Sequence, residues 1–284
     1  GIKAPTSGIV LQLMKGERRD LVQVADGTER PVRVKVDALL AERALDRAAR
    51  LWAGFGYAEA ALVLQPHLDD LAAAESVPEP LRERVAAALH ASEAFAAWDR
   101  LDHRRALRLF GDHALDKRAG LGPWLQPLRA LALPDKRMPL LLLDLWHNAL
   151  RRAARGQYDD AVARCYRLVE ATAQHLLRAG HGIDTVSVDL AKLHQELRAK
   201  WEKELGPKRE AGLAKAWRLF VDVAPEHLAA RRLRQPWQGQ KPLAALDAWI
   251  KERNDSLLAH GFEPVTERGW RTVKEGMDRH WVAS

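Results

Sequence analysis

The chain has 284 residues, of which 47% are hydrophobic, and it carries a formal net charge of +7 with a pI of about 9.7. This length fits two or three small domains or one large one, and the apolar content supports a sizeable core. A single cysteine, Cys165, excludes an internal disulfide framework and a multi-cysteine metal site, and the longest apolar runs are too short to span a membrane.

The basic charge favours an acidic partner such as RNA or DNA, although a moderate positive excess is also common on other soluble proteins. Arginine predominates over lysine, which suits the binding of phosphate but also results from a GC-rich coding bias. Cys165 lies in a helical pattern and is expected in the core, and the low cysteine usage fits a reducing, cytoplasmic location.

The first 37 residues predict a small α/β piece. The chain opens at Gly1 without a methionine, so either it has been processed or it begins inside a domain whose earlier part lies upstream. Residues 6–15 predict a short helix. Residues 20–26 and 31–37 alternate with period two and are rich in valine, which is typical of strands. This piece is too short to bury itself and must pack on something else.

From residue 38 the pattern is helical. Residues 38–55 and 57–74 predict a pair of helices that is interrupted at Gly54–Gly56, and residues 78–103 and 104–117 predict two more. Pro134 and Pro139 then bracket a boundary, after which a second helical block begins. The helices expected in that block cover residues 139–155, 158–180, 188–204, 208–224, 243–260 and 266–284, with a loop at 180–187 and a basic loop at 231–242.

Residues 44–50 resemble residues 149–155, and each stretch is followed by a glycine, a tyrosine and an alanine. We interpret this similarity as two helical hairpins with the same turn chemistry, rather than as a duplicated function. Four tryptophans at helical spacing are expected in the core: Trp98, Trp146, Trp201 and Trp217.

The helix predicted over residues 243–260 ends at Gly261 and carries an unusual polar set in its last two turns. Arg253 and His260 are seven residues apart, so both project from one face, with Cα atoms roughly 10 Å apart along the axis. Arg253 shares its spacing with the apolar stripe, where a solvated arginine has no reason to be. Asn254 lies about 100° round the helix.

These groups suit the cleavage of RNA by attack of the ribose 2′-hydroxyl on the adjacent phosphate. His260, near a helix C-terminus that favours the imidazolium, transfers the proton; Arg253 braces the charge on the phosphate; and Asn254 orients either group. This chemistry requires no metal. His175, His181 and Asp184 lie close in the sequence, but their spacing matches no standard metal site, so we expect none. A paired arginine and a helix-ending histidine without catalysis are the structural alternative.

The stretch RNDSLLAHGF resembles the R-N-x-x-x-x-x-H motif of HEPN ribonucleases, in the form found in ancillary nucleases of type III CRISPR systems. Residues 145–174 resemble the paired helices that open the HEPN domain, and residues 95–110 resemble the helical linker before it. The opening GIKAPTSGIVLQLM is similar to a Gly-Gly-Thr-Lys segment and the following helix of a CARF domain, which is a sensor of cyclic oligoadenylate. Here Ile2 replaces the threonine, and the preceding glycine is absent.

The resemblance implies a mainly α protein with three parts. Residues 1–37 are expected to be the C-terminal remnant of a Rossmann-like CARF domain, residues 38–135 a helical linker domain, and residues 136–284 an all-α HEPN ribonuclease domain. Most of the sensor fold would then lie upstream of this chain. Lys3 is the one residue of the remnant that the resemblance carries over to activator binding.

The resemblance also implies a homodimer, in which two Arg253-Asn254…His260 motifs meet in one cleft and cut single-stranded RNA in antiviral defence. Cyclic oligoadenylate would activate the enzyme where a complete sensor is present, and no cofactor is expected. The basic loop before the motif is expected either to track the RNA, with its tryptophan stacking on a base, or to be a solvated loop with that tryptophan in the core. The RNA-binding candidates are Arg231, Arg232, Arg234, Trp237 and Lys241.

Two other functions remain open. The chain could be a helical module that binds RNA or a partner protein without catalysis, its basic charge and helical hairpins carrying the function. The intact Arg253-Asn254…His260 set argues against that alternative, because a scaffold has no need of it. An unregulated, toxin-like HEPN nuclease is the third option.

Overall fold

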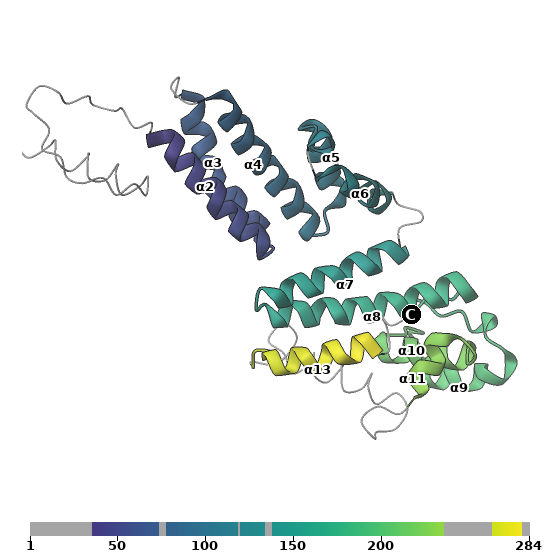
Figure 1. Cartoon of the computed structure of the whole chain (residues 1–284). Coiled ribbons are helices and arrows are strands. Elements are labelled where there is room, and N and C mark those ends of the chain that lie inside the picture. The colour runs from purple at the N-terminus through teal and green to yellow at the C-terminus, as the bar shows by residue number, and fades with distance from the viewer. Residues whose placement is uncertain (1–35, 74–77, 119, 134–137, 236–262, 280–284) are drawn as a thin grey trace, which may run out of the picture. The chain divides into compact units, whose positions relative to one another are not determined.

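The computed structural model describes residues 36–73, 78–118, 120–133, 138–235 and 263–279, and these residues form helices joined by turns (Figure 1). The mainly α fold expected for this part of the chain is therefore confirmed. The internal contacts separate residues 1–36 from residues 37–284. The first 35 residues lie outside the described residues. They include Lys3, the predicted helix 6–15, the predicted strand 20–26 and most of the predicted strand 31–37.

The end of that second predicted strand is described, and there the strand prediction is wrong. Val36 and Asp37 begin helix α2 (Val36–Ala53). Asp37 lies in the first helical turn, where a carboxylate complements the positive end of the helix dipole. The sequence that follows is rich in alanine and leucine, which favour a helix over a strand.

Within the described residues, the first helical block contains α2, four further α-helices and two short 3₁₀ turns. Its further elements are α3 (Tyr57–Ala73), α4 (Glu79–Asp99), α5 (His103–Asp112), η1 (Leu115–Lys117), η2 (Gly122–Trp124) and α6 (Leu125–Ala132). The expected interruption at Gly54–Gly56 is confirmed, because α2 ends and α3 begins on either side of it. The helix predicted over residues 104–117 is divided instead: Ala114 adopts a left-handed conformation (φ 48°) between α5 and η1.

Two apolar clusters hold this block together. Small side chains of α2, α3 and the first half of α4 form one, in which Ala41, Ala44, Ala60 and Leu64 are almost fully buried. Larger side chains form the other, between the second half of α4, α5 and α6. Phe95 contacts several rings there, and the N-cap of α5 is Asp102, which accepts the Arg105 backbone N–H at 3.0 Å.

The second helical block is built around a hairpin of two long helices. Its elements are α7 (Met138–Ala154), α8 (Tyr158–His181), η3 (Leu190–Lys192), α9 (Gln195–Leu205), α10 (Leu213–Val223), α11 (Leu228–Arg234) and α13 (Glu267–Met277). Helix α7 packs along α8, and α8 also contacts α10 and α13 (Figure 1). The turn between α7 and α8 contains Gly156 at φ 71°, a conformation that favours glycine. The interpretation of residues 149–155 as one arm of a helical hairpin is thus confirmed.

The core of this block contains the side chains that the sequence assigned to it. Trp146, Trp201, Trp217 and Cys165 are buried there, and Trp98 is buried in the first block. The indole N–H of Trp217 donates to the Val169 carbonyl at 2.9 Å, so its polar edge is satisfied. Burial raises the pKa of the Cys165 thiol well above its ordinary value, which makes it an inert core residue.

Two predicted helices of this block begin later than expected. The helix predicted from residue 188 begins at Gln195, and the one predicted from residue 208 begins at Leu213. The segments before them bond to each other instead, because Val188 donates to the Arg209 carbonyl at 2.9 Å and Ala211 to the Thr185 carbonyl at 2.8 Å. No helix in the described part of the chain is long and apolar enough to cross a membrane.

Candidate functional site

The three motif residues, Arg253, Asn254 and His260, lie outside the described residues, as do Trp237 and Lys241. The structure instead describes the two flanks of the stretch that contains them. The chain leaves the described part after Gln235 and returns to it at Glu263.

The C-terminal flank is fixed to the start of α8. The backbone N–H of Val265 donates to the Asp159 carboxylate, with both oxygens at 3.2 Å, and the Val265 side chain is buried in the core. The next residue, Thr266, caps α13 by accepting the Gly269 N–H at 3.2 Å. The chain is therefore held on α8 five residues after His260.

The N-terminal flank is helix α11, and here the expectation of a basic loop is corrected. Arg231, Arg232 and Arg234 belong to this helix. The sequence from Leu228 to Leu233 combines good helix formers with two buried positions, Ala230 and Leu233. Gln235 adopts an extended conformation, because the proline that follows it disfavours helical geometry at that residue.

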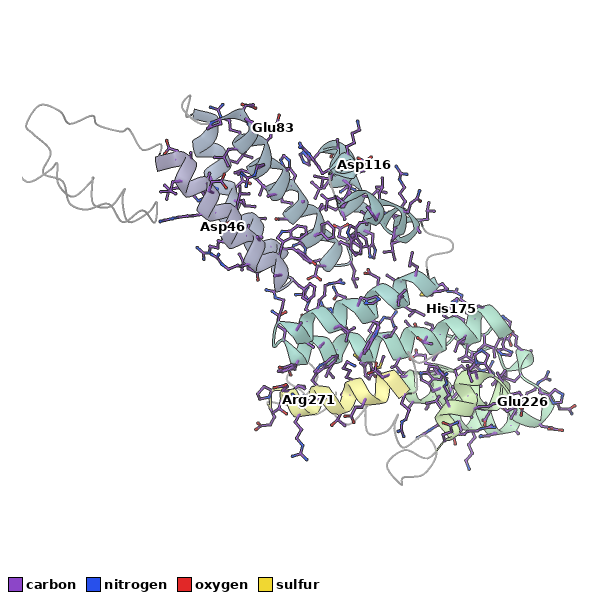
Figure 2. The ribbon with its side chains drawn as sticks, viewed as in Figure 1. Asp46, Glu83, Asp116, His175, Glu226 and Arg271 are labelled. Carbon is purple, nitrogen blue, oxygen red and sulfur yellow. The ribbon has the colours of Figure 1, made fainter. Side chains whose placement is uncertain are left out.

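The three arginines of α11 differ in what they contact. Arg231 is exposed and pairs at 2.5 Å with the exposed carboxylate of Glu226. Glu226 precedes the helix (Figure 2). Arg234 donates to the Val221 carbonyl at 3.1 Å and so ties α11 to the end of α10. Arg232 is half-buried. Arg231 and Arg234 are both exposed, but Arg231 makes a surface ion pair whereas Arg234 is tied to the backbone of α10.

A buried polar network, which the sequence reasoning missed, joins α4 to α7. The Asp99 carboxylate at the end of α4 accepts the Arg151 Nε–H at 2.9 Å and the Arg152 Nη2–H at 2.5 Å. The amide of Asn148 donates at 2.8 Å both to that carboxylate and to the Asp99 carbonyl. Asn148 is fully buried, so these bonds compensate for a desolvation that is costly for an unpaired amide.

The same network continues from α7 into α8. The Asn148 side-chain oxygen accepts from the Nε–H of Arg164, and Arg164 also pairs with Asp160 one turn earlier on α8. Arg152 reaches the same Asp160 carboxylate at 3.6 Å. Asp160 is the chain neighbour of Asp159, so the network ends beside the residue that holds the C-terminal flank of the motif.

A second buried carboxylate, that of Asp144, lies on the same side of α7. It accepts the Trp98 indole N–H at 3.2 Å and lies 2.8 Å from the His103 Nε2. The sequence signal for this polar face is a stripe along an otherwise leucine-rich helix: positions 144, 148, 151, 152 and 155 recur at helical spacing. That stripe marks the side of α7 that contacts the polar side chains at the end of α4 and the start of α5.

The residues considered as metal ligands do not come together. His175 lies within α8 (Figure 2), His181 ends that helix, and the Asp184 carboxylate accepts from Arg178 and from the Val186 backbone N–H. Within the described part of the chain, no three His, Cys, Asp or Glu side chains gather where they could hold a metal ion.

Comparison with known protein families adds the decisive observation. The profile of the family described as the Csm6 HEPN domain matches residues 131–280, slightly more than half of the chain. The chain belongs to the Csm6 HEPN family. This assigns it to the CRISPR-associated HEPN ribonucleases, the group that its motif resembles. No curated protein and no solved structure gives a significant match to the chain.

The Csm6 HEPN match extends from the end of α6 through α13 and includes the positions of Arg253, Asn254 and His260. It also includes the α7 and α8 members of the polar network, whereas their partner Asp99 lies before it. The network therefore links the family domain to the helices that precede it in the chain.

Proposed function

We propose that this Csm6 HEPN protein is a metal-independent endoribonuclease that cleaves single-stranded RNA. The observation that carries the proposal is the Arg-Asn…His set at positions 253, 254 and 260, which falls inside the matched family region. The anchoring of the chain at Val265 on Asp159 supports it, because a catalytic constellation needs rigid attachment close to the reacting groups.

The proposed reaction is an internal transfer. The 2′-oxygen forms a bond to the adjacent phosphorus while the bond from phosphorus to the 5′-oxygen breaks. Either His260 takes the proton of the 2′-hydroxyl while water protonates the leaving 5′-oxygen, or His260 protonates the 5′-oxygen while water takes the proton of the 2′-hydroxyl. Arg253 stabilises the charge that builds on the phosphate oxygens, and Asn254 orients the histidine or the phosphate. The products carry 2′,3′-cyclic phosphate and 5′-hydroxyl ends.

The RNA is proposed to reach this site along the segment that begins in α11. Arg231, Arg232 and Arg234 would contact the backbone phosphates together with Lys241, while Trp237 stacks on a base. Of the three arginines of α11, Arg231 is the one whose guanidinium is held by a surface ion pair of low strength, its bond to Glu226, and is therefore easily released to a phosphate.

We further propose the assembly and regulation that this family suggests. The chain acts in the cytoplasm as a homodimer through its HEPN domain, in type III CRISPR antiviral defence, without a cofactor. Residues 1–37 are the end of a CARF sensor domain, residues 38–135 a helical linker domain and residues 136–284 the HEPN domain. Cyclic oligoadenylate is the proposed activator, with Lys3 as a contact to it.

The proposal is tested by incubating the purified chain, in EDTA, with a fluorescent single-stranded RNA, with and without cyclic tetra- and hexa-adenylate. Cleavage with cyclic-phosphate ends is expected, and His260→Ala or Arg253→Ala is expected to lower the rate by about two to four orders of magnitude, with an unchanged thermal midpoint. A variant with near-normal turnover would overturn the site, and a requirement for a divalent cation would overturn the mechanism. RNA that the wild-type dimer binds but never cuts would establish a non-catalytic binding module instead.

A further inference from the structure

A cavity of about 860 Å³ lies where the turn between α2 and α3, the end of α4 and the η2–α6 segment meet α7. The ribonuclease proposal gives it no role. Its volume is in the range of small-molecule sites, which are typically lined by apolar and aromatic side chains with a few polar groups. The aromatic lining consists of Trp52, Phe55, Tyr57, Phe95, Trp98 and Trp124.

The rings are arranged so that one of them stays free to stack. Phe95 is the centre of the group, with its ring 5.0 Å from Trp52, 5.5 Å from Tyr57 and 5.8 Å from Trp98. Trp124 lies 6.1 Å from Phe95 and from Trp98, at 84° to both rings. It therefore stacks face to face on neither, and it is 49% exposed, so part of its ring surface is available to a planar ligand.

Helix α7 supplies the opposite wall with one continuous stripe. Leu140, Leu143, His147, Leu150 and Ala154 line the cavity at intervals of three and four residues. Arg151 lies on the same side and adds a guanidinium to the lining. The apolar part of this wall suits the body of an aromatic heterocycle, and the polar part suits an anionic or carbonyl group.

The cavity lining contains two carboxylates, whose bonds are made within the protein, and three groups that are free to bond a ligand. The carboxylates of Asp99 and Asp144 are occupied by Arg151, Arg152, Asn148, His103 and Trp98. By contrast, the Tyr57 hydroxyl, the His147 imidazole and the Trp124 indole N–H have no hydrogen-bond partner among the described residues. Burial raises the pKa of the Tyr57 hydroxyl; the positive charge of Arg151 lowers that pKa, and the negative charge of Asp99 raises it. The hydroxyl therefore keeps its proton at neutral pH and can donate a hydrogen bond.

We propose that this cavity is a binding site for a mononucleotide, with the base stacked on Trp124 beside Tyr57 and the phosphate directed to Arg151 and His147. Open aromatic faces recognise a base, and a guanidinium with nearby donors recognises a phosphate. The donors without partners favour a ligand with polar groups over a purely apolar one, because an apolar ligand would separate them from water without replacing those bonds. The site depends only on described residues, and it does not rest on the ribonuclease proposal.

The test is a titration of the full chain with AMP, GMP, CMP and UMP, followed by intrinsic tryptophan fluorescence and by calorimetry. Trp52, Trp98 and Trp124 line the cavity, so an occupied site is expected to quench the fluorescence. Trp124→Ala is expected to weaken binding by about ten-fold or more, the effect of removing one stacking ring. Leu143→Glu, which places a negative charge in the cavity wall where it repels a phosphate, is expected to abolish it.

Leu62→Glu is the matched control, because Leu62 lies on α3 outside the lining, is 74% exposed and undergoes the same substitution. It is expected to bind as the wild type does, and all three variants are expected to keep the wild-type thermal midpoint. Absence of binding at millimolar nucleotide would overturn the proposal. So would binding that Trp124→Ala and Leu143→Glu leave unchanged, or binding that His260→Ala abolishes, because the nucleotide would then occupy the proposed cleavage site.

Discussion

The Asp159 carboxylate holds the backbone of Val265, with both of its oxygens 3.2 Å from the Val265 nitrogen. The two residues are 106 positions apart in the sequence, so this bond joins the start of α8 to the chain just after the proposed catalytic motif. A carboxylate that receives a backbone N–H makes one of the stronger kinds of protein hydrogen bond. It also lies in the first turn of α8, where a negative charge is favourable.

Substitution of Asp159 is expected to affect cleavage more than stability. Asp159→Ala removes the acceptor for Val265 and should lower the free energy of unfolding by about 1–3 kcal/mol, the cost of an unmade bond to a charged group. Loss of this anchor also lets the backbone near His260 shift, so we expect at least a ten-fold lower kcat, measured well below the thermal midpoint.

Asp184→Ala provides the control for Asp159. The Asp184 carboxylate also accepts a backbone N–H, that of Val186 at 3.0 Å, but it lies in the loop after α8. We expect a smaller loss of stability and normal cleavage from this variant. Equal kcat values for Asp159→Ala and Asp184→Ala would show that the Asp159 contact does not position the catalytic groups.

Asn148 is expected to be among the least replaceable polar residues of the chain. Asn148→Ala removes two donors from Asp99 and leaves the Arg164 Nε–H without its acceptor, all in a buried setting. We expect a loss of about 2–4 kcal/mol in the free energy of unfolding by urea, because the remaining charged groups become under-satisfied. The adjacent His147 is exposed, so His147→Ala should change that free energy by less than about 0.5 kcal/mol. A loss for Asn148→Ala as small as that for His147→Ala would contradict this account.

Arg231 is expected to contribute to RNA affinity without contributing to stability. In an inactive His260→Ala background, Arg231→Ala should weaken RNA binding and reduce the slope of log K against log salt by about 0.7, the value for one lost phosphate contact on a single strand. Its thermal midpoint should stay normal, because an exposed ion pair with Glu226 contributes about 0–1 kcal/mol.

Arg271 on α13 (Figure 2) is the matched control for Arg231, since it too is exposed and pairs at 2.6 Å with a glutamate, Glu267. Fluorescence anisotropy over a range of salt concentrations separates the two variants. If Arg271→Ala and Arg231→Ala reduce the salt slope equally, the effect is one of overall charge and α11 has no special part in binding RNA.

The stability of the first block is expected to fall in acid because of His90. Its ring stacks on that of His113, with centroids 3.5 Å apart and planes 11° from parallel. Burial lowers the His90 pKa, the charges of His113 and Arg118 lower it further, and Glu93 opposes them. The folded state therefore binds a proton at His90 less readily than the unfolded state does. The free energy of unfolding is unaffected above the unfolded pKa of about 6.5, where His90 is neutral in both states. It decreases as the pH falls below that value and through the lower pKa of the folded state.

The contribution of His90 to the acid-induced loss of stability is measured by the decrease in thermal midpoint between pH 7.5 and pH 5.5, in each variant and in the wild type. His90→Gln is expected to show a smaller decrease on acidification than the wild type, because the titrating ring has been removed. His175→Gln, which replaces a histidine on α8 outside this stack, is the control and should follow the wild type. A His90→Gln variant with the full acid-induced decrease would exclude this histidine as the cause.

The sequence by itself determined the helical character of the described chain and most helix positions. Apolar spacing located α2, α3, α7 and α8, and the glycines between them located both hairpin turns, because period and turn chemistry are local properties. The core tryptophans followed from the same spacing. The motif at Arg253, Asn254 and His260, together with the resemblance it supports, led to the HEPN family before any tertiary structure was considered.

Sequence reasoning failed where local signals were overridden by distant contacts. The basic segment at Arg231 reads as a loop by composition, yet Ala230 and Leu233 pack into the core and stabilise a helix there. The start of the helix predicted from Val188 was misplaced, because its backbone bonds to Arg209 twenty-one residues later.

Only the tertiary structure decided which side chains meet. Nothing in the sequence near Asp99 indicates that Asn148 and two arginines from α7 surround it, or that Asp159 receives the Val265 N–H. The aromatic cavity likewise collects rings from α2, α3, α4 and η2 against a stripe of α7. The physical reason is that a helical pattern specifies which face of a helix is buried, whereas the partner of that face depends on how separate helices pack together.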